Sequence, residues 1–374
     1  MRVGVDTFTI RELRLDPFAT FDYLVKNGFD GAQFGELRGL SQELDPARLR
    51  EVRSEADHRG LYCHVSVPCC NPHIIAGNLT EHTVELTKQI EAAAEAGWHE
   101  LHSTLGNGME RYEHPVRWTQ QLADSADFIR DLGPVLRQNG SRINLETHGD
   151  VTTFELVRLV EDVGPDIAGI CLDTANVLCH AEDPVLAARR AAPYTHLTHT
   201  KDGIIYFSSR GYVRQGRPPG QGCLDWNQIL PALAEFSPEL PLSIEDHKWL
   251  FEFNVFEKRW LALHPDLTLE EFARVMRLAH LCEERIARGE LENPDQYEAI
   301  PYAEQMEERL AFGRDFLNGL LLARGLKTKK GAEQSSTPSS WYAPCFNGVS
   351  GSSTPQSSRR SRGMSENDPP GRTS

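Results

Sequence analysis

Four side chains that could bind a divalent metal each stand at the end of a short apolar run. They are Glu146, Asp173, His199 and Glu245. Apolar runs of this length that lack a two-residue alternation are typical of strands buried on both faces. The first two intervals each match one β/α unit, and the last interval is longer. Because the carboxyl ends of parallel strands in a barrel meet at one face, the sequence predicts that the four side chains form one metal site.

The ligand set is rich in oxygen, because it combines three carboxylates with one imidazole. Such a set suits Mn²⁺, Mg²⁺ or Co²⁺ better than a structural Zn²⁺, which prefers thiolates. Four protein ligands leave room for two adjacent oxygens of a ketose or hydroxyketone, and the metal would stabilise the enediolate formed on proton loss. The alternative is that the four are unrelated polar residues at strand ends. Any one of them alone would favour that alternative, but their common position favours the metal site.

The two glutamates have a further expected role in catalysis. We expect Glu146 and Glu245 to face each other across the site, one on each face of the bound carbon. Two carboxylates in this arrangement can remove a proton from one side of the carbon and return it to the other. The sequence therefore predicts a pair of acid/base residues that are also metal ligands.

Weaker candidates for substrate binding lie at other strand ends or in the loop after the seventh strand. They are His64, His102, His148, Lys201 and Arg217. The two histidines of the third and fourth strands could line the pocket or only support it, and His148 could contact substrate or cap a loop. Lys201 could neutralise an oxyanion or pair with its neighbour Asp202. Arg217 precedes a Pro-Pro-Gly turn and could hold a polar substrate, although a loop arginine is usually only solvated.

Two aromatic residues follow Glu245 and extend this set of candidates. Trp249 and Phe251 could stack on a sugar face, but packing against additional helices is the more common use of such residues.

Eight apolar runs, each followed by a helical pattern, position these candidates. We expect strands over residues 3–8, 31–35, 61–67, 99–105, 142–146, 169–173, 196–199 and 240–245. The first four are followed by expected helices over residues 17–27, 46–59, 80–96 and 117–138. Eight parallel strands joined by helices predict a (β/α)8 TIM barrel. An open doubly wound sheet is less favoured, because no GxGxxG turn follows any of these strands.

Three segments exceed the minimal barrel. Residues 204–225 form a long loop after the seventh strand, and residues 249–326 form a helical extension with helices over 268–288 and 302–323. The second of these helices could cover the barrel or pair subunits of a homo-oligomer. From residue 327 to 374 the sequence is rich in Ser, Gly, Pro and Thr, which predicts a disordered tail. The expected organisation is one domain over residues 1–326 and a tail.

The overall composition excludes several classes of partner. The net charge of −15 indicates that the protein lacks the positively charged surface that binding to nucleic acids requires. No window approaches the ~20 apolar residues of a membrane span. The 8 cysteines form no CxxC pair, and several lie in apolar runs, which is typical of reduced core thiols. The N-terminal stretch does not resemble a signal peptide, so we expect a cytoplasmic protein.

Four segments around the predicted ligands resemble signatures of a known superfamily. They are Leu-Glu-Thr-His over 145–148, Leu-Asp-Thr-Ala-Asn over 172–176, His-Leu-Thr-His-Thr-Lys-Asp-Gly over 196–203 and Ser-Ile-Glu-Asp over 243–246. The chain is similar over about residues 1–248 to the xylose-isomerase-like TIM barrels, in particular the sugar phosphate isomerase/epimerase group. The resemblance implies that Glu146, Asp173, His199 and Glu245 bind the metal and that the two glutamates are the acid/base pair.

One residue departs from the pattern of that group. Ketose epimerases and several dehydratases carry a histidine three residues after the sixth-strand aspartate, and this chain has Asn176 there. An amide can hold a substrate hydroxyl but cannot transfer a proton, so Asn176 is a candidate for substrate binding only.

The leading hypothesis is a sugar or keto-sugar isomerase or epimerase of carbohydrate metabolism, dependent on Mn²⁺ (or on Mg²⁺ or Co²⁺), that acts on a small carbohydrate through an enediolate. The first alternative is a metal-dependent lyase, which would remove a β-leaving group from a keto-polyol or a dehydroshikimate-like substrate. A third is a binding protein that keeps the metal but has lost turnover.

Overall fold

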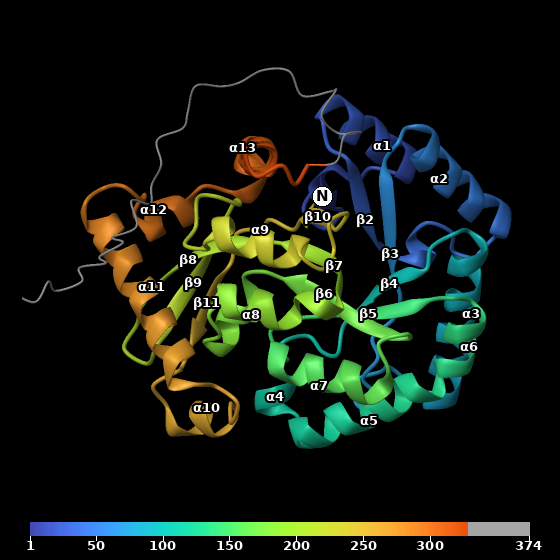
Figure 1. The fold of residues 1–374 in the computed structure, drawn as a ribbon, viewed down its shortest axis with the longest axis horizontal. Helices are drawn as coiled ribbons and strands as arrows, with labels where there is room; N and C mark the ends of the chain where they lie inside the picture. The colour runs from blue at the N-terminus through green and yellow to red at the C-terminus, as the bar shows by residue number, and fades with distance from the viewer. Residues whose placement is uncertain (328–374) are drawn as a thin grey trace, which may run out of the picture. The chain divides into compact units, whose positions relative to one another are not determined.

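Eight parallel strands close into a barrel in the computed structural model, which describes residues 1–327 (Figure 1). Around the barrel the order is β1-β10-β7-β6-β5-β4-β3-β2. Each barrel strand therefore lies beside the barrel strands that precede and follow it along the chain. Their bounds are β1 Arg2–Asp6, β2 Gly31–Glu36, β3 Tyr62–Ser66, β4 Glu100–Ser103, β5 Arg142–Glu146, β6 Ala168–Asp173, β7 Thr195–Thr200 and β10 Pro241–Ile244. The predicted TIM barrel is confirmed. The predicted disordered tail lies outside the described residues.

Helices surround the barrel, and polar caps mark where most of them begin. They are α1 Pro17–Lys26, α2 Pro46–His58, α3 Leu79–Glu95, α5 Trp118–Asp131, α6 Gly133–Gln138, α7 Thr153–Val163, α8 Pro184–Ala191, α9 Trp226–Ala234 and α13 Tyr302–Ala323. Asp16 and Asp45 cap α1 and α2 by accepting hydrogen bonds from backbone N–H groups of the first turn. The helix predicted over 117–138 is instead two helices, because Pro134 lacks an N–H and disfavours helical backbone at Gly133.

A tyrosine fills the lower part of the barrel interior. The Tyr62 hydroxyl reaches past β2 and β1 and lies 3.0 Å from Ser243 Oγ on β10. A Cβ atom at Gly4 or Gly31 would collide with the Tyr62 side chain, so these strands need glycine where they pass the ring. The floor of the barrel is therefore closed, and space for a ligand lies only above it, at the carboxyl ends of the strands.

A small antiparallel sheet stands over one side of the barrel mouth. Its strands are β8 Asp202–Phe207, β9 Tyr212–Arg217 and β11 Leu250–Phe253, in the order β11-β9-β8. The long loop predicted over 204–225 is thus largely a β-hairpin, completed by a strand from beyond β10. The helices α10 Lys258–Ala262, α11 Leu269–Ala287 and α12 Pro294–Ala299 lie on the same side of the molecule (Figure 1).

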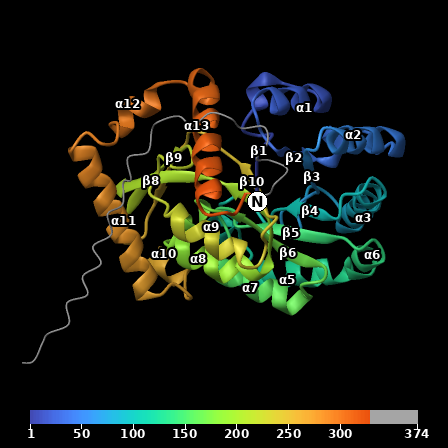
Figure 2. The same ribbon diagram turned by 45° about the horizontal axis from the view of Figure 1, so that its top comes forward.

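The extension predicted over 249–326 divides into two parts with different roles. Helix α13 packs against β1 and β10 and completes the ring of helices, as Figure 2 shows beside the N-terminus. Residues between β10 and α13 are therefore an insertion before the eighth barrel helix. Of the two roles considered for this helix, covering the barrel is the one that these contacts support.

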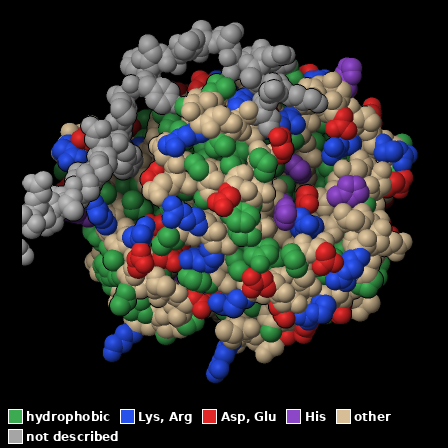
Figure 3. Space-filling model, in the orientation of Figure 1, with side chains coloured by type: hydrophobic (Ala, Val, Ile, Leu, Met, Phe, Trp, Pro, Cys, Tyr) green, Lys and Arg blue, Asp and Glu red, His purple; other side chains and the backbone are tan. Residues whose placement is uncertain are grey.

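The surface of the described part mixes charges of both signs. Figure 3 shows acidic and basic side chains interspersed over one face of the molecule. None of the helices within residues 1–327 combines the length and the apolar character needed to cross a bilayer.

Candidate metal centre and active-site pocket

The four predicted ligands converge at the carboxyl end of the barrel. Glu146 ends β5, Asp173 ends β6, His199 lies on β7, and Glu245 directly follows β10. Asp173 and His199 are register partners on neighbouring strands. All four are buried, and one ligand atom of each lies within 4.8 Å of those of the others. The strand ends thus bring together side chains that are far apart in sequence.

One ring nitrogen of this cluster has no hydrogen-bond partner in the described part of the chain. The His199 Nδ1 atom lies 3.2 Å from Glu146 Oε1 and 2.9 Å from Glu245 Oε2, close but without hydrogen-bond geometry. Asp173 Oδ2 and Glu245 Oε2 are in ion-pair contact with the ammonium group of Lys201. Buried polar atoms are rarely left unsatisfied, so His199 Nδ1 and the carboxylate oxygens around it fit a cation. Carboxylates with one imidazole are ligands suited to a divalent ion.

Residues behind the cluster hold the ligands in place. The His102 Nε2 atom lies 3.1 Å from Glu146 Oε2, and His102 Nδ1 lies 2.9 Å from Ser66 Oγ. Gln33 Nε2 lies 2.6 Å from His199 Nε2, the ring nitrogen that faces away from the cluster. Contacts of this kind fix the orientation of a metal ligand. The sequence did not predict a role for Gln33, because an amide side chain within the short second strand is the only indication of one.

Charges inside the cluster keep the two glutamates ionised. Burial would raise the pKa of Glu245, but Lys201 and His199 outweigh it and hold that pKa well below its usual range. Burial is likewise outweighed at Glu146, chiefly by His199, so the pKa of Glu146 is also held well below its usual range. Asp6 lies 3.6 Å from His199 Nε2, and burial is the main cause that raises the pKa of Asp6 to about 7.

Lys201 contributes a buried positive charge to the same cluster. Its Nζ atom lies 2.7 Å from Asp173 Oδ2 and 3.0 Å from Glu245 Oε2. The alternative pairing with Asp202 does not form. Asp202 instead accepts hydrogen bonds from Trp226 Nε1 and from backbone N–H groups of the loop, including that of Gly220. Lys201 therefore balances carboxylates that are also candidate metal ligands.

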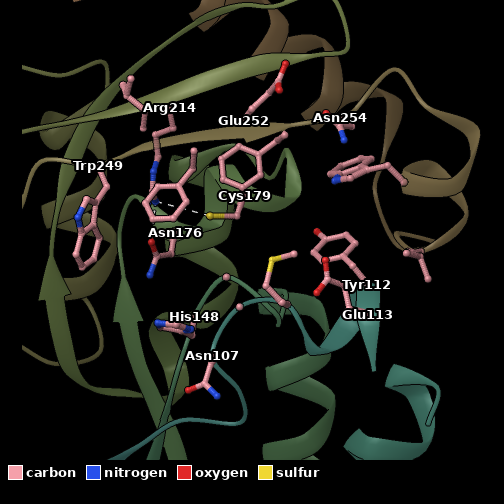
Figure 4. A pocket seen from close by; sticks show the side chains of 18 of the residues that line it. Asn107, Tyr112, Glu113, His148, Asn176, Cys179, Arg214, Trp249, Glu252 and Asn254 are labelled. Atoms are coloured by element: carbon pink, nitrogen blue, oxygen red, sulfur yellow. Dashed lines mark hydrogen bonds between the residues drawn. The ribbon is translucent and has the colours of Figure 1, made fainter. Parts of the chain in front are cut away.

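A pocket of about 1040 Å³ opens above the cluster. Its inner part is polar and includes Glu245 and Lys201. Its outer wall comes largely from β11 and α10, and Figure 4 shows Trp249 on one side and Tyr112, from the short helix α4 Glu110–Glu113, on the other. Trp249 and Phe251 thus line the pocket, with 44% and 38% of their surfaces exposed. Of the two uses considered for these aromatic residues, their position favours contact with a ligand.

Three of the six predicted substrate-binding residues lie at the pocket. His148, Asn176 and Lys201 line the pocket. His102 stands behind Glu146, and its pKa is lowered by burial. His64 lies lower on β3, with its ring 5.5 Å from that of Tyr62, and burial lowers the pKa of His64 to about 4.

Arg217 lies away from the pocket, and another arginine of the same strand lines it. The Arg217 guanidinium stacks on Tyr297 at 3.3 Å from the ring centroid and donates a hydrogen bond to Gln215. Arg214, three residues earlier on β9, faces the pocket instead. Alternation along a strand places residues three apart on opposite faces, but that signal requires knowing that the loop is a strand.

The barrel and its cluster define a class of protein, the (β/α)8 barrels with a carboxylate-rich centre at the strand ends. Residues 21–261 match the model of the xylose isomerase-like TIM barrel family, and the chain belongs to that family.

Among curated proteins, the chain is 28% identical over 123 residues to the uncharacterised protein YihM of Escherichia coli, a match that covers 33% of this chain and 37% of YihM. It is 24% identical over 147 residues to the inosose dehydratase of Clostridium tetani, covering 36% of this chain and 49% of that enzyme. The matches thus span less than half the length of either relative.

A solved structure supports the fold over a longer range. The structure of an L-ribulose 3-epimerase aligns with a TM-score of 0.56 and 20% identity, covering 90% of this chain and 99% of that one. At this identity the likeness shows the shared fold alone. The proteins similar to this chain thus include one named as an epimerase, in fold alone, and one named as a dehydratase, in part of its sequence.

Proposed function

We propose that the protein is a divalent-metal-dependent isomerase or epimerase that acts on a sugar or keto-sugar by proton transfer through an enediolate. The observation that carries this proposal is the position of the two glutamates. The carboxylates of Glu146 and Glu245 both lie within 3.2 Å of one imidazole nitrogen, His199 Nδ1. A substrate carbon bound next to the cluster would therefore be within reach of two bases.

The metal would be held by Glu146, Asp173, His199 and Glu245. When bound, a divalent ion supplies Lewis acidity that stabilises negative charge on neighbouring substrate oxygens. We expect Mn²⁺, with Mg²⁺ or Co²⁺ as alternatives, because three carboxylates with one imidazole can bind each of these ions.

The chain's own residues would move the proton. One glutamate removes the proton next to the substrate carbonyl, and the other returns a proton to the same or the neighbouring carbon. Their low pKa values, held down by His199 and Lys201, keep both carboxylates ionised at neutral pH, the form that a base requires. Asn176, whose Nδ2 atom lies 3.5 Å from Glu146 Oε1, would hold a substrate hydroxyl beside the first of these bases.

The test is incubation of the protein with Mn²⁺ and a panel of ketoses in deuterium oxide, followed by mass spectrometry and NMR. We expect a product of unchanged composition that carries solvent deuterium at the carbon that exchanged its proton. Product formed without solvent deuterium would indicate hydride transfer and would contradict the proposal. Activity that is indifferent to a chelator, in protein that contains no divalent metal, would contradict the role of the cluster.

A lyase is the second candidate, and one observation favours it. The sequence is similar to that of an inosose dehydratase over part of its length. A lyase on this site would remove the same proton, but a β-hydroxyl would then leave as water. The two candidates are separated by product mass, because only a dehydratase product is lighter by one water.

A further inference from the structure

One arginine at the pocket carries a charge that no carboxylate balances. Arg214 lies on β9, is 4% exposed and lines the pocket above the metal ligands. Of the other buried arginines in residues 1–327, Arg309 binds Asp246 with two hydrogen bonds and Arg111 binds Glu155. Arg217 has no ion pair either, but it stacks on Tyr297 away from the pocket. Within residues 1–327, no carboxylate lies within ion-pair distance of Arg214.

The hydrogen bonds of Arg214 use only part of its guanidinium. Its Nη1 atom donates to Asn176 Oδ1 at 2.7 Å and to the backbone oxygen of Ala175 at 3.1 Å, and it lies 3.7 Å from Cys179 Sγ. Its Nε and Nη2 atoms have no partner in the described part of the chain. A buried cation without a counter-charge is unfavourable, so structural support alone does not account for this residue.

The surroundings of Arg214 hold its guanidinium in a fixed position. Phe251 is its register partner on β11, and the guanidinium carbon lies 5.1 Å from the centre of the Phe251 ring. Figure 4 shows Arg214 on the same wall of the pocket as Asn176 and His148. A guanidinium stacked on an aromatic ring and anchored at one nitrogen is pre-organised to bind a planar anion with its remaining nitrogens.

The other charged groups of the pocket are already occupied or lie further out. Lys201 is bound between Asp173 and Glu245. Glu252 pairs with Arg210 at 2.8 Å on the exposed side of the hairpin. Arg259, on α10 at the outer wall, has no ion pair either, but it is exposed and donates a hydrogen bond to the backbone oxygen of Tyr112. Arg214 is thus the buried cation at the inner wall whose charge remains to be balanced by a ligand.

Asn176 connects this cation to the candidate metal centre. It accepts a hydrogen bond from Arg214, and its own Nδ2 atom lies 3.5 Å from Glu146 Oε1. An anion bound by Arg214 would therefore lie one side chain away from the catalytic glutamate. This spacing suits a small substrate that carries its anionic group a few bonds from the carbon that loses a proton.

We propose that Arg214 binds the carboxylate of the substrate and that the site acts on an acidic sugar or a polyhydroxy keto acid. This inference rests on the proposed function, because it names the substrate class of the same site. One guanidinium matches the charge and the two oxygens of a carboxylate, whereas a phosphate dianion usually takes more donors and a helix N-terminus.

Calorimetry on the full-length protein in the presence of Mn²⁺ tests this assignment. The probes are D-glucuronate with D-glucose, D-gluconate with D-glucitol, and tartrate with threitol, so that each acid has a neutral counterpart. D-Glucose 6-phosphate tests the other source of an anionic group. We expect at least one acid to bind tenfold or more tightly than its counterpart. In Arg214→Gln this preference should fall by about 10- to 100-fold, because a charge-assisted pair is lost.

Two further variants control for charge and geometry. Arg210→Gln removes the same charge from the same hairpin at a side chain that is 53% exposed, and it should leave the preference for acids unchanged. Arg214→Lys keeps the charge but loses the paired N–H donors of the planar guanidinium. It should therefore retain only part of the preference for acids. The melting temperature of Arg214→Gln should equal or exceed that of the wild-type protein, because the substitution removes an unbalanced buried charge.

The assignment is overturned if no acid is preferred by the wild-type protein or if the preference survives in Arg214→Gln. It is also overturned if glucose 6-phosphate is the tightest ligand in an Arg214-dependent manner. Equal loss of affinity for acids and neutral sugars, with a lowered melting temperature, would show a structural role instead. None of these binding results depends on turnover. Failure of the proposed function would appear separately, as absent metal or absent deuterium exchange.

Discussion

The two glutamates at the cluster lie in different surroundings. Imidazoles flank Glu146, because His102 and His199 lie at 3.1 and 3.2 Å from its two oxygens. An ammonium group faces Glu245, because Lys201 Nζ lies 3.0 Å from its Oε2 atom. The two carboxylates are therefore not equivalent, which suits separate roles in removing and returning a proton.

Replacing either glutamate by glutamine is the first prediction at this scale. Glu146→Gln and Glu245→Gln should each lower kcat by at least about 10²-fold, because loss of a positioned base typically costs that much. Steady-state kinetics on the substrate found in the deuterium experiment measures the loss. Glu113→Gln is the matched control, since Glu113 lines the pocket without contacting the cluster. Full activity in the Glu146→Gln, Glu245→Gln double variant would rule out this pair as the acid and base.

A buried aspartate near the pocket should make stability depend on pH. Asp150 is fully buried, neither of its carboxylate oxygens has a hydrogen-bond partner in residues 1–327, and the nearest cation candidate is His148 Nδ1 at 3.7 Å. Burial is the main cause that raises the pKa of Asp150 from 3.8 to about 6. The folded protein therefore binds this proton more tightly than the unfolded chain does. The associated stability is present below about pH 4 and is lost as the pH rises through 6.

Asp150→Asn should remove this dependence. Ionising the buried carboxylate costs about 3 kcal/mol at pH 8, since each unit of pKa shift corresponds to about 1.4 kcal/mol. Relative to the wild-type protein, the variant should gain about 1–3 kcal/mol in free energy of unfolding at pH 8 and nothing near pH 4. Urea denaturation at both pH values measures the difference. Asp127→Asn, at a side chain that is 73% exposed, is the control. An equal effect of Asp150→Asn at both pH values would contradict the assignment.

At the scale of elements, helix α13 is attached to the barrel beside the catalytic end of β10. Arg309 on α13 binds Asp246 through Nε at 2.7 Å and Nη2 at 2.5 Å, and both side chains are buried. The Tyr302 hydroxyl, at the start of α13, donates to the backbone oxygen of Asp246 at 2.8 Å. Because Asp246 follows Glu245 directly, the eighth helix also fixes the position of that glutamate.

Breaking this ion pair should destabilise the protein strongly. Arg309→Met leaves the Asp246 carboxylate buried without a counter-charge, so it should lower the free energy of unfolding by about 3–5 kcal/mol. The double variant with Asp246→Asn should recover much of that loss, because no uncompensated charge remains. Chemical denaturation of the two single variants and the double variant provides a double-mutant cycle. Additive effects of the two substitutions would mean that the pair is not coupled.

The barrel and the ligands could be predicted from sequence because local signals define them. Each barrel strand is a short apolar run, and Glu146 or Asp173 stands where such a run ends. The sheet over the mouth could not be predicted in the same way. Its strands β9 and β11 are separated by the whole of α9 and β10, and their pairing depends on contacts between distant residues.

The choice between Arg217 and Arg214 depends on the same kind of long-range pairing. Arg217 precedes a recognisable turn, so the sequence favours it as a ligand-binding residue. Only the register of the β8–β9 hairpin reveals that Arg214 faces the pocket while Arg217 stacks on Tyr297. That α13 is the eighth barrel helix could not be predicted from the sequence either, because an insertion separates α13 from β10.

At the scale of the whole molecule, the family barrel supplies the cluster and the insertion supplies most of the outer wall of the pocket. The strand ends hold Glu245 and Lys201 at the base, and Trp249, Phe251 of β11 and Trp260 of α10 lie above them. On the proposed function, the barrel would carry the chemistry and the insertion would contribute to substrate selection. Changes in the insertion should alter which substrate binds without changing the reaction.

Metal removal should lower the stability of the entire fold, because the proposed ligands come from four strands of one closed barrel. A ligand that binds only the folded state at 100 times its dissociation constant adds about 2.7 kcal/mol. Thermal unfolding of chelator-treated protein, with and without added Mn²⁺, should therefore differ by a few degrees. The Glu146→Gln, Glu245→Gln double variant should show little or no shift, and potassium should not replace Mn²⁺. Equal melting temperatures with and without Mn²⁺ in the wild-type protein would show that the cluster does not bind this metal.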